Sequence, residues 1–116
     1  MKKLLFLILV ASFNVSSAEQ AITQWVYNTL ERAQANLDKG NIEAAEKIYY
    51  DYANDTWSSR SYDHFVILRT YAYFLLSNDR NEEALRYLKQ ASLKRDMPPY
   101  DIFELHFTLG QVYYVT

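Results

Sequence analysis

The sequence contains no cysteine, only two glycines and only two prolines. Without cysteine the chain can form no disulfide bridge and carry no lipid on an N-terminal cysteine, so apolar burial has to supply its stability. Glycine and proline are the residues that most often interrupt helices. Their scarcity, together with apolar residues recurring at spacings of three and four rather than two, predicts helices almost throughout and no strand.

Clustered positive charge is also missing. Once Lys2 and Lys3 are set aside, ten lysines and arginines stand against fourteen aspartates and glutamates, and no basic run occurs. Nucleic acid and anionic lipid are recognised through clustered Lys and Arg, so the sequence disfavours both as partners. The one adjacent pair, Lys94 and Arg95, suits the C-terminal end of a helix, where cations complement the helix dipole.

No apolar run is long enough to cross a membrane. Two lysines at 2–3, eight apolar residues at 4–11 and small residues at 16–18 are the three parts of a signal peptide. They predict cleavage after Ala18, whereas a transmembrane anchor, the alternative, needs about 18 to 20 apolar residues. The mature chain would then be periplasmic and not itself inserted in a membrane, and residues 19–116 suffice for one domain.

The apolar pattern predicts two antiparallel helix hairpins and the first helix of a third. Their expected ranges are about 21–53, about 62–95 and about 99–116. Gly40 and Asn41 separate the two helices of the first hairpin, because glycine readily adopts the left-handed conformation that ends a helix. Several residues are expected to face the core, namely Ile22, Val26, Leu30, Ala33, Leu37, Ile42, Ala45, Ile48, Tyr49, Tyr52, Phe65, Leu68, Ala72, Leu75, Leu76, Ala84, Leu85, Leu88 and Ala91.

Three sites carry helix-start signals. Ser61 is a candidate N-cap for the second hairpin. Asp79 and Glu82 have the spacing of a capping box before its second helix. Pro99 suits the first position of the last helix.

The motif Tyr-Asp-x-Phe occurs at 62–65 and again 38 residues later at 100–103. A shift of 39 likewise superimposes Ala33 on Ala72 and Ala45 on Ala84. A period of this length built from helix pairs predicts an all-α solenoid. Within it, the Tyr and Phe of both copies are expected to pack between hairpins, while the Asp serves the start of its helix.

These residues resemble tetratricopeptide repeats. The family has small residues at two helix positions, a Gly-Asn type of turn and a Pro near the end of the repeat. The matching residues here are Ala33, Gly40, Asn41 and Ala45, then Ala72, Ala84, Ala91 and Pro98, then Leu109, Gly110 and Tyr113. The resemblance implies a right-handed superhelical solenoid of antiparallel hairpins. The period of 38 to 39 exceeds the family's 34, and Asp79 stands where the second turn glycine belongs.

A narrower likeness rests on "QWVYNTLERAQ", "SYDHFVILRTYAYFL" and "MPPYDIFELHFTLGQVY" behind a signal peptide. These stretches are similar to periplasmic tetratricopeptide proteins whose genes accompany TonB-ExbB-ExbD systems in gamma-proteobacteria. The likeness implies an accessory of TonB-dependent energy transduction or outer-membrane uptake, with TonB-complex components as partners.

The family binds peptides in a concave groove lined by the first helix of each hairpin. Its groove positions fall here on Tyr27, Gln34, Arg69, Tyr73, Glu104, Phe107, Gln111 and Tyr114. Aromatic rings beside amide and charged groups suit the backbone of an extended chain. The alternative is that these tyrosines pack on a neighbouring hairpin.

Catalytic signals are scarce. His64 and His106 are the only histidines, neither belongs to an H-E-x-x-H pattern, and no glycine-rich phosphate loop occurs. We therefore expect no enzyme activity, no cofactor and no metal; the alternative is a weak metal site formed by the two histidines.

The last helix ends in "GQVYYVT", apolar and without a cap, whereas a terminal repeat normally needs a polar closing surface. This predicts that the chain continues in a longer natural form, or that a partner or a second copy covers the face. The expected function is an exported scaffold for a protein or peptide partner. Two alternatives are a repeat segment of a larger cell-envelope enzyme or assembly factor, and self-association through the last helix.

Overall fold

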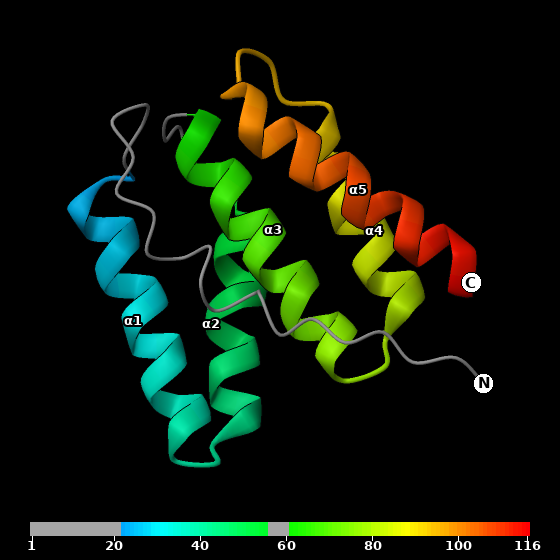
Figure 1. The fold of residues 1–116 in the computed structure, drawn as a ribbon. Coiled ribbons are helices and arrows are strands. Elements are labelled where there is room, and N and C mark those ends of the chain that lie inside the picture. Colours follow the sequence, from blue (N-terminus) through cyan, green and yellow to red (C-terminus); the bar gives the residue numbers. More distant parts are fainter. Residues whose placement is uncertain (1–21, 56–60) are drawn as a thin grey trace.

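A computed structural model describes residues 22–55 and 61–116 of the chain. Five helices follow one another in these ranges, namely α1 (Gln24–Asp38), α2 (Ile42–Asn54), α3 (Ser61–Ser77), α4 (Asn81–Ser92) and α5 (Pro99–Val115). Each helix packs against the next in an antiparallel manner, so that α1 with α2 and α3 with α4 form hairpins (Figure 1). The prediction of an all-α chain of sequential hairpins is confirmed, and the predicted signal peptide lies outside the described residues.

The first helix begins later than the apolar pattern indicated, at Gln24 rather than near residue 21. Thr23 caps it with a hydroxyl that accepts a hydrogen bond from the Val26 N–H. The Thr23 N–H in turn donates to Oδ1 of Asp63, at 3.1 Å, from the start of α3. The start of the first hairpin is thus attached to the second by a buried carboxylate.

The two hairpin turns have the same backbone geometry, 39 residues apart. Gly40 has φ 81°, and Asp79, its equivalent, has φ 61°. In each turn the residue that follows donates its N–H five residues back, from Asn41 to the Asn36 carbonyl at 2.8 Å and from Arg80 to the Leu75 carbonyl at 2.9 Å. The left-handed residue closes both first helices in the same way.

Two predicted helix starts are wrong. Asp79 and Glu82 form no capping box, because Asp79 belongs to the left-handed turn and Arg80 occupies the cap position without a side-chain cap bond. Ser61 is the first residue inside α3 rather than its N-cap. Pro99 does open α5 as predicted, since its missing N–H has no partner to lose at a first helical position.

The third helix is the centre of the molecule, with thirteen of its seventeen residues buried. Most predicted core positions are buried, but Ile42 is exposed. Tyr71 of α3 was not predicted to be buried; its ring stacks at 6.0 Å from Tyr49 of α2 and lies 4.7 Å from Tyr87 of α4. Ring packing of this kind joins three helices at one point.

The two copies of Tyr-Asp-x-Phe have different surroundings. In the first copy, Tyr62 and Phe65 are buried and their rings stack at 6.1 Å. In the second copy, Tyr100 and Phe103 are exposed. The prediction that both copies pack between hairpins is therefore wrong for the second, because α5 has no further described helix against its outer side.

Candidate functional site

A buried ionic cluster joins α3 to α5. Nη1 of Arg69 donates to Oδ1 of Asp101 at 3.0 Å and lies 3.6 Å from Oε1 of Glu104. All three side chains are at least four-fifths shielded from solvent. Oε1 of Glu104 has an ionic neighbour in Arg69 but no hydrogen bond among the described residues. Removing one member of this cluster should destabilise the fold, because a charge that is shielded from solvent and has no counter-charge raises the free energy of the folded state.

Aromatic side chains complete the cluster. The Arg69 guanidinium lies 5.2 Å from the centre of the Phe65 ring, at cation–π distance. Burial, with the charge and hydrogen bond of Asp101, raises the pKa of Tyr62 to about 12. Burial also raises the pKa of Tyr73, which the hydrogen bond of Thr108 opposes. Both phenols therefore stay neutral near pH 7.

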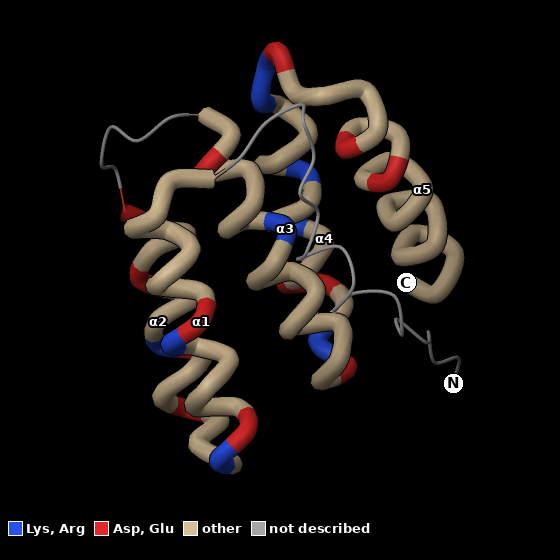
Figure 2. Tube along the Cα trace, turned by 60° about the vertical axis from the view of Figure 1, so that its left-hand side comes forward, with Lys and Arg blue, Asp and Glu red and all other residues tan. Residues whose placement is uncertain are grey.

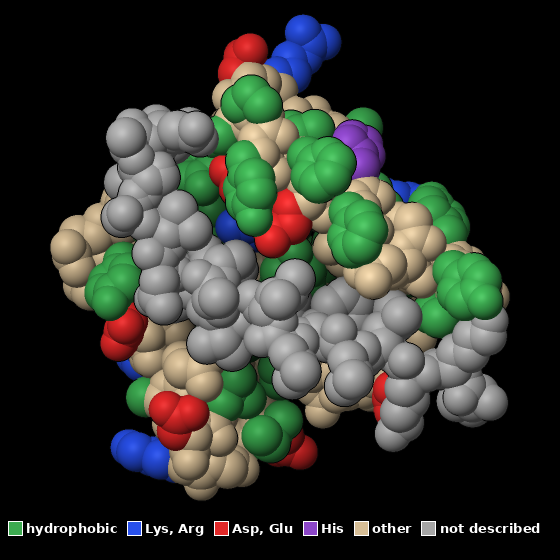
Figure 3. Space-filling model, viewed as in Figure 1, with side chains coloured by type: hydrophobic (Ala, Val, Ile, Leu, Met, Phe, Trp, Pro, Cys, Tyr) green, Lys and Arg blue, Asp and Glu red, His purple; other side chains and the backbone are tan. Residues whose placement is uncertain are grey.

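Three of the eight predicted groove residues thus meet in this cluster. Arg69 and Tyr73 are buried and the Glu104 side chain is only 15% exposed, so that a ligand reaches the first two only if α3 and α5 separate. Figure 3 shows acidic and basic side chains between the two helices, surrounded by hydrophobic ones. In this structure the three residues hold helices together.

Two further candidates lie on the exposed face of α1. The hydrogen bond and the charge of Glu31 raise the pKa of the exposed Tyr27. Nε2 of Gln34 donates to Oδ1 of Asp38 at 3.0 Å. Each candidate is therefore oriented by a carboxylate one turn further along the helix.

The last three candidates, Phe107, Gln111 and Tyr114, lie on α5, a different helix from the one that carries Tyr27 and Gln34. Phe107 and Tyr114 are exposed, and Gln111 is half-buried. Sequence reasoning missed that Tyr100 and Phe103 extend this exposed face. Phe103 lies four residues before Phe107 and Tyr100 three residues before Phe103, and this helical spacing is the signal that could have found them.

A second ionic cluster connects α2 with the α3–α4 turn. Nη1 and Nη2 of Arg80 donate to the two carboxylate oxygens of Glu46, each at 2.8 Å, and Tyr71 donates to the same carboxylate at 2.7 Å. Nε of Arg80 donates to Glu83 at 2.7 Å. The Arg80 hydrogen bond, with that of Tyr71, lowers the pKa of Glu46 against the opposing effect of burial.

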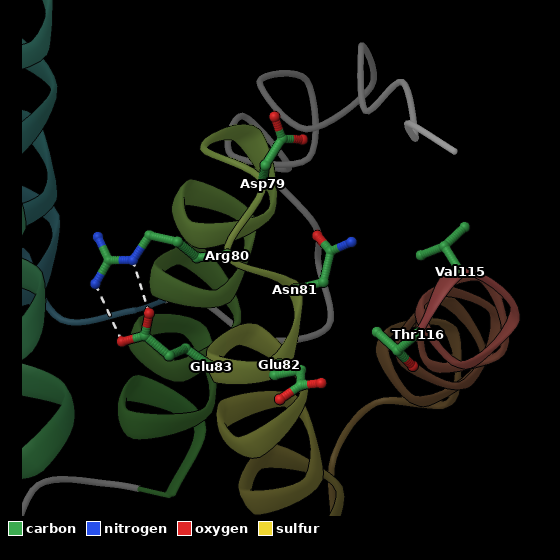
Figure 4. A pocket seen from close by; sticks show the side chains of 7 residues that line it. All are labelled: Asp79, Arg80, Asn81, Glu82, Glu83, Val115 and Thr116. Carbon is green, nitrogen blue, oxygen red and sulfur yellow. Dashed lines mark hydrogen bonds and ion pairs between the residues drawn. The ribbon is translucent and has the colours of Figure 1, made fainter. Parts of the chain in front are cut away.

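The Arg80 turn also borders a pocket of about 540 Å³ beside the end of α5 (Figure 4). It is lined by Asp79, Arg80, Asn81, Glu82, Glu83, Val115 and Thr116. Arg80 points to Glu83 and is held by Glu46, so it is not available to bind an anion there.

The histidines are not brought into a metal cluster. Nε2 of His64 lies 3.0 Å from the Ala53 carbonyl, to which it must donate, since a carbonyl only accepts. Burial lowers the pKa of His64 despite that bond, and the charge of Lys94 lowers it further. His106 is on the exposed side of α5. Among the described residues, no group of three or more His, Asp or Glu side chains could hold a metal ion.

The chain matches no protein-family model, and neither curated proteins nor solved structures provide a match. Within the described ranges, no helix combines the length and the apolarity needed to span a bilayer. Fold and site together define a small all-helical domain of five sequentially packed helices, whose open candidate surfaces lie on α1 and α5.

Proposed function

We propose that this chain is an exported, tetratricopeptide-like scaffold that binds a protein or peptide partner and carries out no reaction of its own. One observation carries the proposal. Of the eight large aromatic side chains exposed among the described residues, seven lie on α1 and α5, the first and the last of the described helices. Exposed aromatic groups gathered on a rigid helical frame are typical of interaction surfaces.

The face of α1 is the part of the predicted groove that stays open. Its Tyr27 ring and Gln34 amide are oriented by Glu31 and Asp38. A ring, an amide and two carboxylates suit an extended segment that offers backbone amides and a basic side chain. We therefore assign partner binding first to this face.

Two features support the tetratricopeptide-like arrangement. The left-handed turns at Gly40 and Asp79 repeat with a spacing of 39 residues. Helix-start aspartates also repeat with a spacing of 38: Asp63 accepts a hydrogen bond from the preceding hairpin at Thr23, and Asp101 accepts one from the preceding hairpin at Arg69. In both places a carboxylate in the first turn of a helix accepts a hydrogen bond from the preceding hairpin, once from a backbone N–H and once from a guanidinium.

Export and service to a TonB system remain part of the proposal. They rest on the predicted signal peptide and on the likeness of the helical stretches to periplasmic accessory proteins. The acidic balance of the mature chain is compatible with a partner that presents basic groups.

The test is a crosslinked pull-down from the native periplasm with wild type and two double variants. Tyr27→Ala with Gln34→Ala removes the α1 groups, and Lys47→Ala with Asp51→Ala removes an exposed pair on α2 as a control. We expect wild type and control to recover the same TonB-complex components, and the α1 variant to lose at least nine-tenths of them.

If the α1 variant recovered the same amount of partner as wild type, the partner would bind to a face other than that of α1. Recovery of no partner by wild type, or absence of the processed chain from the periplasm, would contradict the proposed function. Circular dichroism of each variant has to show unchanged helix content for these readings to hold.

A further inference from the structure

An exposed stripe runs the length of α5. It consists of Tyr100, Phe103, Phe107, Gly110 and Tyr114, at successive spacings of three, four, three and four. The four aromatic members are 64%, 69%, 58% and 72% exposed in that order. At about 1.5 Å per residue the stripe is about 21 Å long. Figure 3 shows hydrophobic side chains gathered along this helix from its beginning to its end.

The equivalent face of α3 is a helix-docking face that is already occupied. Shifted by 38 residues, Tyr62, Phe65 and Arg69 correspond to the first three members of the stripe, and they are only 8%, 0% and 6% exposed. Asp101 of α5 reaches both Arg69 and Tyr62. The stripe on α5 therefore lies at the repeat position at which α3 is covered by another helix, although the faces paired there are unlike.

We propose that a second copy of this chain occupies the stripe, with two α5 helices packed antiparallel about a twofold axis at Phe107. In that arrangement Phe107 meets its own copy, and Tyr100 of each chain lies opposite Tyr114 of the other. Phe103 lies opposite the interval between Gly110 and Gln111. A self-complementary patch of this kind is what a twofold dimer requires.

Gly110 supplies the shape complementarity. A Cβ built on Gly110 would meet no atom within 4 Å, so this exposed position leaves open space between Phe107 and Tyr114. The ring of Phe103 from a second copy fits over that space, because large side chains pack well against small ones on a facing helix.

The charges of α5 favour an identical partner. The helix contains no Lys or Arg, and its two carboxylates, Asp101 and Glu104, both lie against Arg69 of α3 and are largely shielded from solvent. Figure 2 shows both acidic positions near the start of α5 and none along the rest of it. Two copies of this face bring no like charges together, whereas a strongly charged peptide would find no counter-charge.

The small area of the proposed interface between two α5 helices implies a weak dimer. A single pair of five-turn helices covers less than the 1,200 to 2,000 Å² or so of a stable specific interface. We therefore expect a monomer–dimer equilibrium with a Kd on the order of 10 μM. The proposal is independent of partner binding at α1.

Sedimentation velocity of the purified chain between about 1 and 500 μM provides the first test. Wild type should pass from monomer to dimer across that range and form nothing larger. Phe107→Asp and Gly110→Leu should each weaken the dimer at least tenfold, since one places two charges at the axis and the other fills the space for Phe103. Tyr27→Ala should dimerise as wild type does.

Cysteine crosslinking tests the geometry without background, because the chain has no cysteine of its own. Phe107→Cys should form a covalent dimer under mild oxidation. Tyr100→Cys and Tyr114→Cys should each crosslink poorly alone and well when mixed. Tyr50→Cys, exposed to a similar degree on α2, is the matched control and should crosslink at least tenfold more slowly than Phe107→Cys.

Four outcomes would overturn the proposal. They are a monomer at every concentration, open oligomers larger than a dimer, a dimer unaffected by Phe107→Asp, and crosslinking of Tyr50→Cys as fast as that of Phe107→Cys. Self-pairing of Tyr100→Cys would exclude the antiparallel orientation.

Discussion

At the scale of single residues, Arg69 is the side chain on which the position of α5 depends most. Its guanidinium is the cation for two largely buried carboxylates on another helix. Burial opposes its charge, but Tyr73, Asp101 and Glu104 together raise the pKa of the guanidinium. Such a cluster adds little stability compared with an apolar core of the same volume, yet breaking it is costly because charges are left alone.

Arg69→Met should therefore lower the free energy of unfolding by about 3 kcal/mol, since Asp101 and Glu104 lose their counter-charge while shielded from water. Urea denaturation followed by circular dichroism measures this. Lys47→Met is the matched control, because its ion pair with Asp51 is mostly exposed and should change the free energy by less than about 0.5 kcal/mol. Equal losses in the two variants would show that the α3–α5 cluster is not structural.

His64 should make the stability pH-dependent. Burial lowers the pKa of His64 in the folded state below its ordinary value of 6.5, so the unfolded chain binds the proton more tightly. The stabilisation is fully present above about pH 6.5 and is lost as the pH falls from there through the folded-state pKa. Unfolding free energies measured between pH 8 and pH 5.5 should fall for wild type.

His64→Gln should flatten that pH dependence, because glutamine cannot take up a proton. The control is His106→Gln, which removes an imidazole from the exposed side of α5 and should leave the dependence intact. A wild-type curve that is flat over this range would contradict the role of His64.

At the scale of elements, the two glycines differ in backbone conformation: the one at Gly40 favours glycine, and the one at Gly110 favours alanine. Gly40 ends α1 with φ 81°, a conformation that costs other residues about 1 kcal/mol or more. Gly110 lies inside α5, where glycine is about 0.5 to 1 kcal/mol less favourable than alanine. Neither site lacks space for a methyl group, so only the backbone decides.

Gly40→Ala should thus destabilise the chain by about 1 kcal/mol, and Gly110→Ala should stabilise it by about 0.5 kcal/mol. Thermal and urea unfolding at a protein concentration of about 1 μM, below the expected dimer Kd, gives both values. The two substitutions are controls for each other, and changes of the same sign would contradict the assigned backbone conformations.

The ends of the helices show which local signals can be trusted. Gly40 and Pro99 act as predicted because their effect is a property of their own backbone. Asp79 was mistaken for a cap because an aspartate fits both a cap and a left-handed turn, and the choice depends on where the preceding helix ends. Spacing alone does not contain that information.

At the scale of the whole molecule, the helices differ in how many neighbours cover them. The central α3 is buried along most of its length, whereas α1 and α5 each leave a face exposed. Hydrogen exchange at low concentration should show α3 amides at least tenfold better protected than those of α1 and α5, because terminal helices open locally first. Protection of α5 as strong as that of α3 in the monomer would contradict this order.

The same measurement at high concentration links the fold to the proposed dimer. Exchange of α5 amides should slow when the chain associates, while exchange of α1 amides stays unchanged. If only the α1 amides exchanged more slowly at high concentration, the self-contact would lie on α1, which would contradict the proposed dimer through α5.

The candidate site was predictable only in part. Position in the repeat predicted one groove for all eight residues; Tyr27 and Gln34 are exposed on α1, and Phe107 and Tyr114 are exposed on α5. It did not reveal that Arg69 and Tyr73 are buried under α5, because repeat position specifies a face of a helix and not what lies against that face. Glu104, which was predicted to line the groove, lies against Arg69 and is one of the α5 residues that bury it.

The sequence by itself determined the helices, their hairpins and the left-handed turn at Gly40, because periodicity and backbone preference act within a few residues. Only the tertiary structure decided that one copy of Tyr-Asp-x-Phe is buried and the other exposed. The two copies have the same local chemistry. Burial depends on whether a neighbouring helix removes water from the face, and that neighbour is distant in sequence for Tyr62 and not among the described helices for Tyr100.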